Sequence, residues 1–285
     1  MAEALIPAVA EARPRRARSA SAWPLRALAG RLRGLIVPAV LILLWEGAVR
    51  SGLVARNLLP PPSELVLTVR ELAADGAIFG HILASTTRVA AGFGAGAALG
   101  VLAGAAIGLS PRAEALVGPT FQAVRAIPSL AWAPLLLLWL GIDEAPKVVL
   151  IAIGAFFPVY LNVLSGVQGV DRKLVEVGRI HGLGPLALAR RIFLPAALPS
   201  VFTGLRQGLS LAWMFLVAAE LIAASKGLGF LLTDGRETGR ADVVIVAILT
   251  LALLGKLSDS VLALIERLSL AWRDTVSSNT PRSRP

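Results

Sequence analysis

Three stretches of this 285-residue sequence lack charged side chains over the length needed to cross a lipid bilayer. Residues 89–111 and 148–170 each provide 23 such positions, and residues 126–142 provide 17, whereas a transmembrane helix needs roughly 20 apolar residues. Three further apolar stretches contain isolated charges, which are tolerated where they face a bundle interior or a cavity; these are residues 34–49, 199–224 and 243–264. A buried helix in a soluble core is an alternative for one stretch but not for six. The pattern therefore predicts six transmembrane helices.

The composition argues against a soluble protein. Hydrophobic residues make up 56% of the chain and charged residues 16%, whereas soluble domains average about 25% charged residues. A soluble fold of this size would expose large apolar patches. The chain has no cysteine, which excludes disulfides and thiolate chemistry, and His81 and His181 are a hundred positions apart. We therefore expect an all-α integral membrane protein without a metal site.

The placement of lysine and arginine predicts the orientation of the spans. With a cytoplasmic N-terminus, seventeen of the 28 basic residues fall in cytoplasmic segments, seven in outer segments and four within spans. Cytoplasmic loops of membrane proteins carry such an excess, so both termini are predicted to be cytoplasmic. The net charge of +10 is spread over several loops and tails, which argues against a nucleic-acid partner.

The predicted organisation is a membrane domain between two cytoplasmic tails. A basic tail covers residues 1–33, the membrane domain residues 34–267, and a second tail residues 268–285. The first tail is similar to the positive region of a signal peptide, but it continues directly into the first span, which indicates an uncleaved anchor. The spans are expected at about residues 34–50, 81–109, 115–141, 147–169, 199–224 and 242–265, with a cytoplasmic loop at residues 171–198.

Glycines recur at every fourth position of the second span. Residues four apart lie on neighbouring turns of a helix, so these glycines form a smooth groove along it. In a membrane, small residues allow helix backbones to approach closely. We expect the groove to pack within the chain, with the face of a subunit dimer as the alternative. Its members are Gly92, Gly96, Gly100, Gly104 and Gly108.

Charged residues within the spans have two interpretations. Each can pair with an opposite charge or extend toward a membrane interface, or it can line a translocation path and attract an anionic substrate. The basic members are Arg88, Arg125, Arg206 and Lys256, and the acidic residue hardest to explain is Glu220. Arg125, Arg206 and Glu220 are the candidates for the translocation path, although pairing with a nearby arginine or extension toward the outer interface is the slightly favoured interpretation of Glu220.

The loop between the fourth and fifth spans predicts a compact pair of helices. Leu174, Val177 and Ile180 recur at a spacing of three and share one helical face. Gly182, Gly184 and Pro185 interrupt the pattern, and a second short helix is expected over residues 186–194. A helix with one apolar and one charged face is suited to a groove on a partner protein.

This loop resembles the signature of binding-protein-dependent ABC transporter permeases. That signature has a Glu-Ala-Ala triplet, then a glycine, then a hydrophobic residue followed by proline. Here Glu176, Val177 and Gly178 occupy the triplet, which departs from the pattern at its second and third positions; Gly182 is the glycine, and Leu194-Pro195 end the motif.

Further segments resemble one subfamily of these permeases. LLPPPSEL (58–65), RAIPSLAWAPLLLLWLGI (125–142) and LPAALPSVFTGLRQGLSLAW (194–213) are similar to nitrate, taurine and aliphatic sulfonate importers. Residues 227–259 are most similar to the aliphatic sulfonate permeases.

The resemblance implies a type I importer permease of the bacterial inner membrane that works by alternating access. A separate ATPase subunit would bind ATP and would also bind the loop, so this chain itself would need no cofactor. A periplasmic or lipid-anchored solute-binding protein would deliver an aliphatic sulfonate, and two permease chains would pair within the lipid. Taurine, nitrate or another small anion is the alternative substrate.

The sequence contains no motor or catalytic motif of its own. Neither G-x-x-x-x-G-K-[ST] nor H-E-x-x-H nor G-x-S-x-G occurs, so an enzyme is not expected. The rival from another class is a self-contained secondary transporter or channel. Such a protein would need repeated broken helices and a coupling-ion site, and no convincing internal repeat is present.

Overall fold

The computed structural model describes residues 23–272, with side chains described from residue 36 onward. The predicted tails, residues 1–33 and 268–285, lie largely outside this range. The chain divides after Val54 into two units. The described part of the first unit contains helix α1 (Trp23–Arg50), which carries the first predicted span. Its side chains at positions 36–44 are exposed, and an ion pair of 2.6 Å joins Arg50 Nε to Glu46 Oε1 in the last turns.

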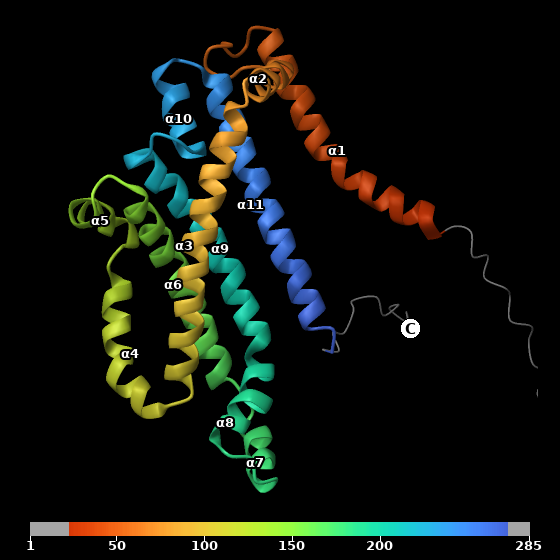
Figure 1. Ribbon diagram of the computed structural model, residues 1–285. Helices are drawn as coiled ribbons and strands as arrows, with labels where there is room; N and C mark the ends of the chain where they lie inside the picture. The colour runs from red at the N-terminus through yellow and green to blue at the C-terminus, as the bar shows by residue number, and fades with distance from the viewer. Residues whose placement is uncertain (1–22, 273–285) are drawn as a thin grey trace, which may run out of the picture. The chain divides into compact units, whose positions relative to one another are not determined.

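The described part of the second unit consists of helices and turns (Figure 1). The predicted all-α class is therefore confirmed for these residues. The elements, in chain order, are α2 (Pro62–Ala74), α3 (Ala77–Gly108), α4 (Pro111–Ala126), the 3₁₀ turn η1 (Ser129–Trp132), α5 (Ala133–Leu140), α6 (Glu144–Gln168), α7 (Arg172–Ile180), α8 (Pro185–Leu188), the π-helical turn η2 (Ala189–Phe193), α9 (Leu194–Ala223), α10 (Leu228–Glu237) and α11 (Ala241–Ser269).

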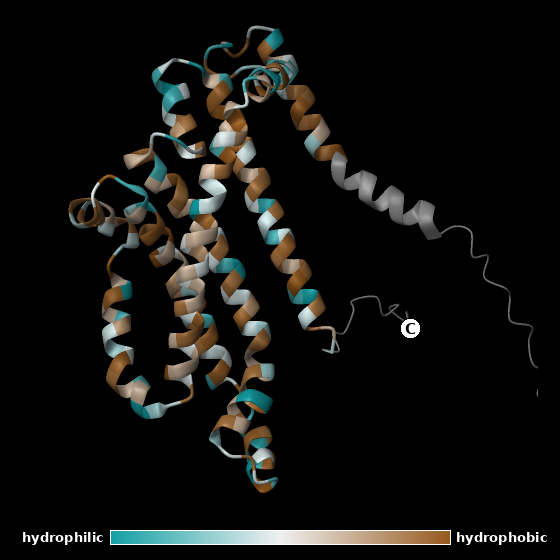
Figure 2. Cartoon of the chain, viewed as in Figure 1, coloured by the Kyte–Doolittle hydropathy of each residue, from teal (hydrophilic) through white to brown (hydrophobic). Residues whose placement is uncertain are grey.

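Four segments of the described chain are long and apolar enough to cross a membrane. They are α3, α6, the continuous run from α8 through α9, and α11, and Figure 2 shows apolar residues along α3, α6 and α11. The predicted spans at 81–109, 147–169, 199–224 and 242–265 fall on these helices. A fifth crossing is present if α4 and η1–α5, which meet at 83°, are counted as one broken span. The predicted span at 115–141 falls on this bent pair.

The bend between α4 and α5 has a local cause in the sequence. Ile127 is extended, with φ −75° and ψ 123°, because a residue that precedes proline is disfavoured in the helical region. Pro128 then supplies no N–H to continue the helix. The chain resumes at Ser129 in the 3₁₀ turn η1 and runs on into α5.

Helix α6 packs between α3 and α9. Five glycines of α3 face α6, and an added Cβ on Gly96 would collide with the carbonyl group of Ala152. On the other side, an added Cβ on Gly154 of α6 would lie 2.5 Å from the Phe215 ring of α9. The glycine groove is therefore filled from within the chain. Its contacts are Gly92 with Ile151, Gly96 with Ala152, Gly100 with Phe156, Gly104 with Tyr160 and Gly108 with Val167.

Helices α2 and α10 pack against the first turns of α11. Leu228 and Leu231 of α10 are buried against Val243 and Ala247 of α11. The Thr68 hydroxyl of α2 donates a 2.7 Å hydrogen bond to Asp242 of α11. Arg240 binds Glu71 of α2 at 2.9 Å and Asp242 at 2.9 Å. These two carboxylates raise the pKa of Arg240, so it remains charged at all physiological pH values.

Candidate functional site

An elbow of two short helices projects from one end of the α6–α9 pair (Figure 1). Asp171 caps the N-terminus of helix α7, and its side chain accepts a 2.9 Å hydrogen bond from the Lys173 N–H. The helix ends at Ile180, His181 is its C-cap, and Gly182 follows with φ +72°. That left-handed conformation is unstrained for glycine and allows the chain to reverse. We call residues 171–193 the elbow.

The elbow presents an exposed apolar stripe beside charged residues. Leu174 and Val177 are about half exposed, and Ile180 is 82% exposed. Leu186 of α8 is also exposed, and Glu176 is exposed on α7. Apolar side chains at i, i+3 and i+6 of an unpartnered helix are typical of a helix that fits a protein groove.

Gly178 is buried, whereas the other two residues of the triplet, Glu176 and Val177, are exposed. It is buried inside the elbow, where an added Cβ would collide with the end of the Ile192 side chain and lie 2.6 Å from that of Leu188. Both contacts are flexible chain ends, so an alanine at this position requires only rotamer shifts. The departure from the triplet at Gly178 therefore leaves the exposed surface of α7 unaltered.

The elbow is continuous with a membrane-spanning helix. Leu188 to Phe193 keep helical dihedrals, with a π-helical turn over residues 189–193, and Pro195 occupies the first turn of α9. The run from Pro185 to Ala223 is one 39-residue segment. The second helix of the elbow therefore continues without a break into α9.

Glu220 of α9 is at the centre of a buried polar network. Its carboxylate is 2.7 Å from Arg88 Nη1, accepts a 2.8 Å hydrogen bond from Ser85, and accepts a 2.7 Å bond from the Gly229 N–H. Arg88 also forms a bidentate ion pair with Glu144, in which Nε and Nη2 donate hydrogen bonds of 2.6 and 2.7 Å to the two carboxylate oxygens. The network ties α3, α6 and α9 to the start of α10.

Two residues of this network had no role assigned from the sequence alone. Glu144 and Ser85 belong to no recognisable motif. The one sequence feature that could have indicated a role for Glu144 is its position in the first turn of α6, three residues before Lys147. Lys147 is buried and lies 2.9 Å from Glu144.

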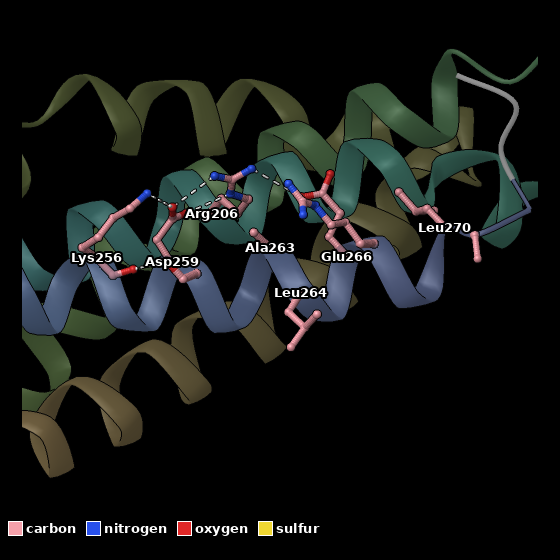
Figure 3. A pocket seen from close by; sticks show the side chains of 10 residues that line it. Arg206, Lys256, Asp259, Ala263, Leu264, Glu266 and Leu270 are labelled. Atoms are coloured by element: carbon pink, nitrogen blue, oxygen red, sulfur yellow. Dashed lines mark hydrogen bonds and ion pairs between the residues drawn. The ribbon is translucent and has the colours of Figure 1, made fainter. Parts of the chain in front are cut away.

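Arg206 pairs with α11 across an open cavity of about 840 Å³. Its guanidinium lies 2.8 Å from Asp259 and 3.4 Å from Glu266. Figure 3 shows these side chains and marks the ion pairs with dashed lines. Lys256 lies 3.8 Å from the same Asp259. The cavity thus contains both signs of charge, and two of its three cations, Arg206 and Lys256, have carboxylate partners.

Arg125 is in the last turn of α4, beside the bend. It lines a second cavity, of about 260 Å³, between α4 and α6. Within the described residues it has no carboxylate at ion-pair distance. The three candidates for the translocation path, Arg125, Arg206 and Glu220, therefore lie in three separate places. The described residues contain no group of three or more histidine, aspartate or glutamate side chains that could hold a metal ion.

These features define a class of protein: a multi-pass α-helical membrane subunit with a protruding amphipathic elbow. The sequence profile described as "Binding-protein-dependent transport system inner membrane component" matches residues 96–269. The chain therefore belongs to this family, and it is a permease subunit of an ABC importer in the inner membrane.

Relatives and a solved structure agree with this assignment. The chain is 42% identical to an aliphatic sulfonates transport permease protein, SsuC, of Bacillus subtilis, over 86% of this chain and 89% of the relative. It is 39% identical to SsuC of Escherichia coli, over 88% and 95%, and 33% identical to the taurine permease TauC of Escherichia coli, over 89% and 94%.

The fold matches a chain of the inward-facing MetNI methionine ABC transporter. The TM-score is 0.60 at 19% identity, over 68% of this chain and 96% of that chain. The fold is therefore that of a type I ABC importer permease.

Proposed function

We propose that this permease imports aliphatic sulfonates. The observation that carries the proposal is the similarity to two proteins named as aliphatic sulfonate permeases, which exceeds the similarity to a taurine permease by six percentage points or more. Taurine is the alternative, as 33% identity to TauC supports. Bicarbonate is another, since the chain is 30% identical to the bicarbonate permease CmpB.

A separate ATPase drives the transport through the elbow. Leu174, Val177 and Ile180 provide the apolar contact, and Glu176 the flanking charge. Gly182 sets the reversal, and the junction at Leu194-Pro195 passes the movement into α9. A solute-binding protein delivers the sulfonate from outside, two permease chains form the pathway, and both termini are cytoplasmic.

The substrate is tested by uptake in a deletion strain of the native host. The strain, with and without the restored gene, is supplied with labelled hexanesulfonate, taurine, nitrate or bicarbonate. Gene-dependent uptake of hexanesulfonate is expected, together with growth on it as sole sulfur source. Uptake of only one of the other anions would contradict the sulfonate assignment. Uptake that persists after the ATPase is inactivated, and stops when ion gradients collapse, would indicate a secondary transporter.

The elbow is tested with Ile180→Asp and Gly182→Asp. Both place a carboxylate on the exposed surface. Gly182 has open space around its Cβ position, but its φ of +72° strains an aspartate there, so Ile180→Asp is the variant that tests the contact without a backbone change. Loss of one central contact typically weakens an interface about tenfold or more, so less ATPase should copurify and uptake should fall. Leu109→Asp, at an exposed apolar residue in the α3–α4 turn, is the matched control. Normal complex assembly and uptake in both elbow variants would refute the docking assignment.

A further inference from the structure

We propose that the cavity beside Arg125 is the site that binds the sulfonate during transport. This inference rests on the proposed function and adds the location and the chemistry of the cargo site. Most charged side chains within the predicted spans have a partner of opposite charge. Arg88 pairs with Glu144 and Glu220, Arg206 with Asp259 and Glu266, and Lys147 with Glu144.

Among the described residues, Arg125 stands apart from these cations. It lies beside the bend between α4 and α5, a pair apolar enough to cross the membrane as one broken span or to enter it as a re-entrant loop. Its side chain is exposed, yet no described residue places an acidic side chain at ion-pair distance from it. An uncompensated charge is costly within a membrane, and an ionisable residue in a membrane-embedded segment is by default a candidate for a substrate or ion pathway. The missing counter-charge is supplied by an anionic cargo.

The cavity provides a polar end and an apolar wall. Arg125 and Gln122 of α4 line it together with Phe121 of the same helix and Tyr160 and Leu164 of α6. The rings of Phe121 and Tyr160 are 4.9 Å apart between centroids. Tyr160 is the only tyrosine of the chain. Ligand sites of small molecules combine apolar walls with a few polar groups in this manner.

The chemistry of the lining fits a sulfonate with an alkyl chain. A guanidinium presents a planar fork that binds two oxygens of an oxyanion at once. The neighbouring aromatic rings provide an apolar surface for the carbon chain. Arg125 therefore holds the sulfonate group, and Phe121 and Tyr160 contact the chain.

Glu114 limits the charge of the cargo. It lines the same cavity but lies eleven positions before Arg125, which is about 16 Å along a helix. A second anionic group on the cargo would approach this carboxylate and be repelled. The cavity thus favours a single anionic head group with an uncharged tail.

The test measures binding of labelled hexanesulfonate to the purified permease–ATPase complex without its binding protein, and uptake by cells. Arg125→Gln is expected to weaken binding about tenfold or more, as for loss of a charge-assisted hydrogen-bond pair, and to reduce uptake. Arg125→Lys keeps the charge but not the fork and should recover part of the binding. Arg112→Gln, which removes a cation from the first turn of the same helix outside this cavity, should bind as the wild type does.

A second variant keeps the proposal testable if Arg125→Gln fails to assemble. Phe121→Ala should weaken binding of hexanesulfonate more than that of methanesulfonate, because only the former reaches the aromatic wall. Equal losses for both, or wild-type binding by an assembled Arg125→Gln complex, would overturn the cavity assignment alone. Absence of hexanesulfonate uptake by the wild type would instead overturn the proposed substrate, and the cargo site with it.

Discussion

Glu220 is fully buried, and its charge is balanced by a single arginine in another helix. Ser85 and Gly229 satisfy further lone pairs of the carboxylate, so the group is fully hydrogen-bonded in an environment that excludes water. Arg88 would keep its second partner, Glu144, if the Glu220 charge were removed, so the cost is that of a lost hydrogen bond between charged groups, about 1.5–3 kcal/mol. The pair therefore holds α3 and α9 together at this point.

Glu220→Gln should lower the stability of the purified complex. The amide keeps the size and a hydrogen-bond acceptor but removes the charge opposite Arg88, which retains Glu144, so a loss of about 1.5–3 kcal/mol is expected. The melting temperature, followed by tryptophan fluorescence, measures it. Glu237→Gln, at an exposed position of α10, should change stability by less than about 0.5 kcal/mol. An unchanged melting temperature with lost uptake would instead favour a role for Glu220 in the translocation path.

The sequence reveals that a charge is present in a span but not which partner balances it. Glu220 and Arg88 are 132 positions apart, and no local pattern links them. The same holds for Arg206 and Asp259, 53 positions apart. Pairing depends on how α3, α6, α9 and α11 pack, which is set by tertiary contacts and not by spacing.

At the scale of helices, the glycine groove of α3 determines how closely α6 approaches. The recurrence of glycine at every fourth position is visible in the sequence, and it predicts that this segment is a helix. The sequence does not reveal which helix fills the groove, because a helix of a partner subunit would satisfy the same pattern. The bend after Ile127 is likewise predictable from Pro128 as a break, whereas its 83° angle and the π-helical turn at 189–193 have no local sequence signal.

Gly96→Ala should destabilise the chain, and Gly94→Ala should not. A Cβ at Gly96 meets the backbone of Ala152, which cannot rotate away, so overpacking of about 1–3 kcal/mol is expected. A Cβ at Gly94 meets nothing within 4 Å, and alanine is the better helix former there. Thermal unfolding of both variants measures the difference. A Gly96→Ala chain that is stable alone but fails to pair would assign the groove to the subunit interface.

For the second unit as a whole, the elbow and the bundle form one mechanical path. The α8–α9 run connects the exposed stripe of α7 to the helix that carries Arg206 and Glu220. Because α6 is packed tightly between α3 and α9 through small residues, we expect a shift of α9 to move α6 and α3 with it. This coupling requires the elbow to be cytoplasmic, which depends on how many times α4 and α5 cross the membrane.

The bent pair determines this topology, and the absence of cysteine makes it directly measurable. Single substitutions Leu109→Cys, Ile142→Cys and Ile180→Cys place one thiol each at an exposed residue in a chain that otherwise has none. If α4 and α5 are one broken span, a membrane-impermeant maleimide should label Ile142→Cys in intact cells, and the other two only after permeabilisation. If the pair is a re-entrant loop, positions 109 and 142 lie on the same side and label alike. Labelling of Ile180→Cys in intact cells would place the elbow outside, beyond the reach of a cytoplasmic ATPase, and would contradict the importer mechanism.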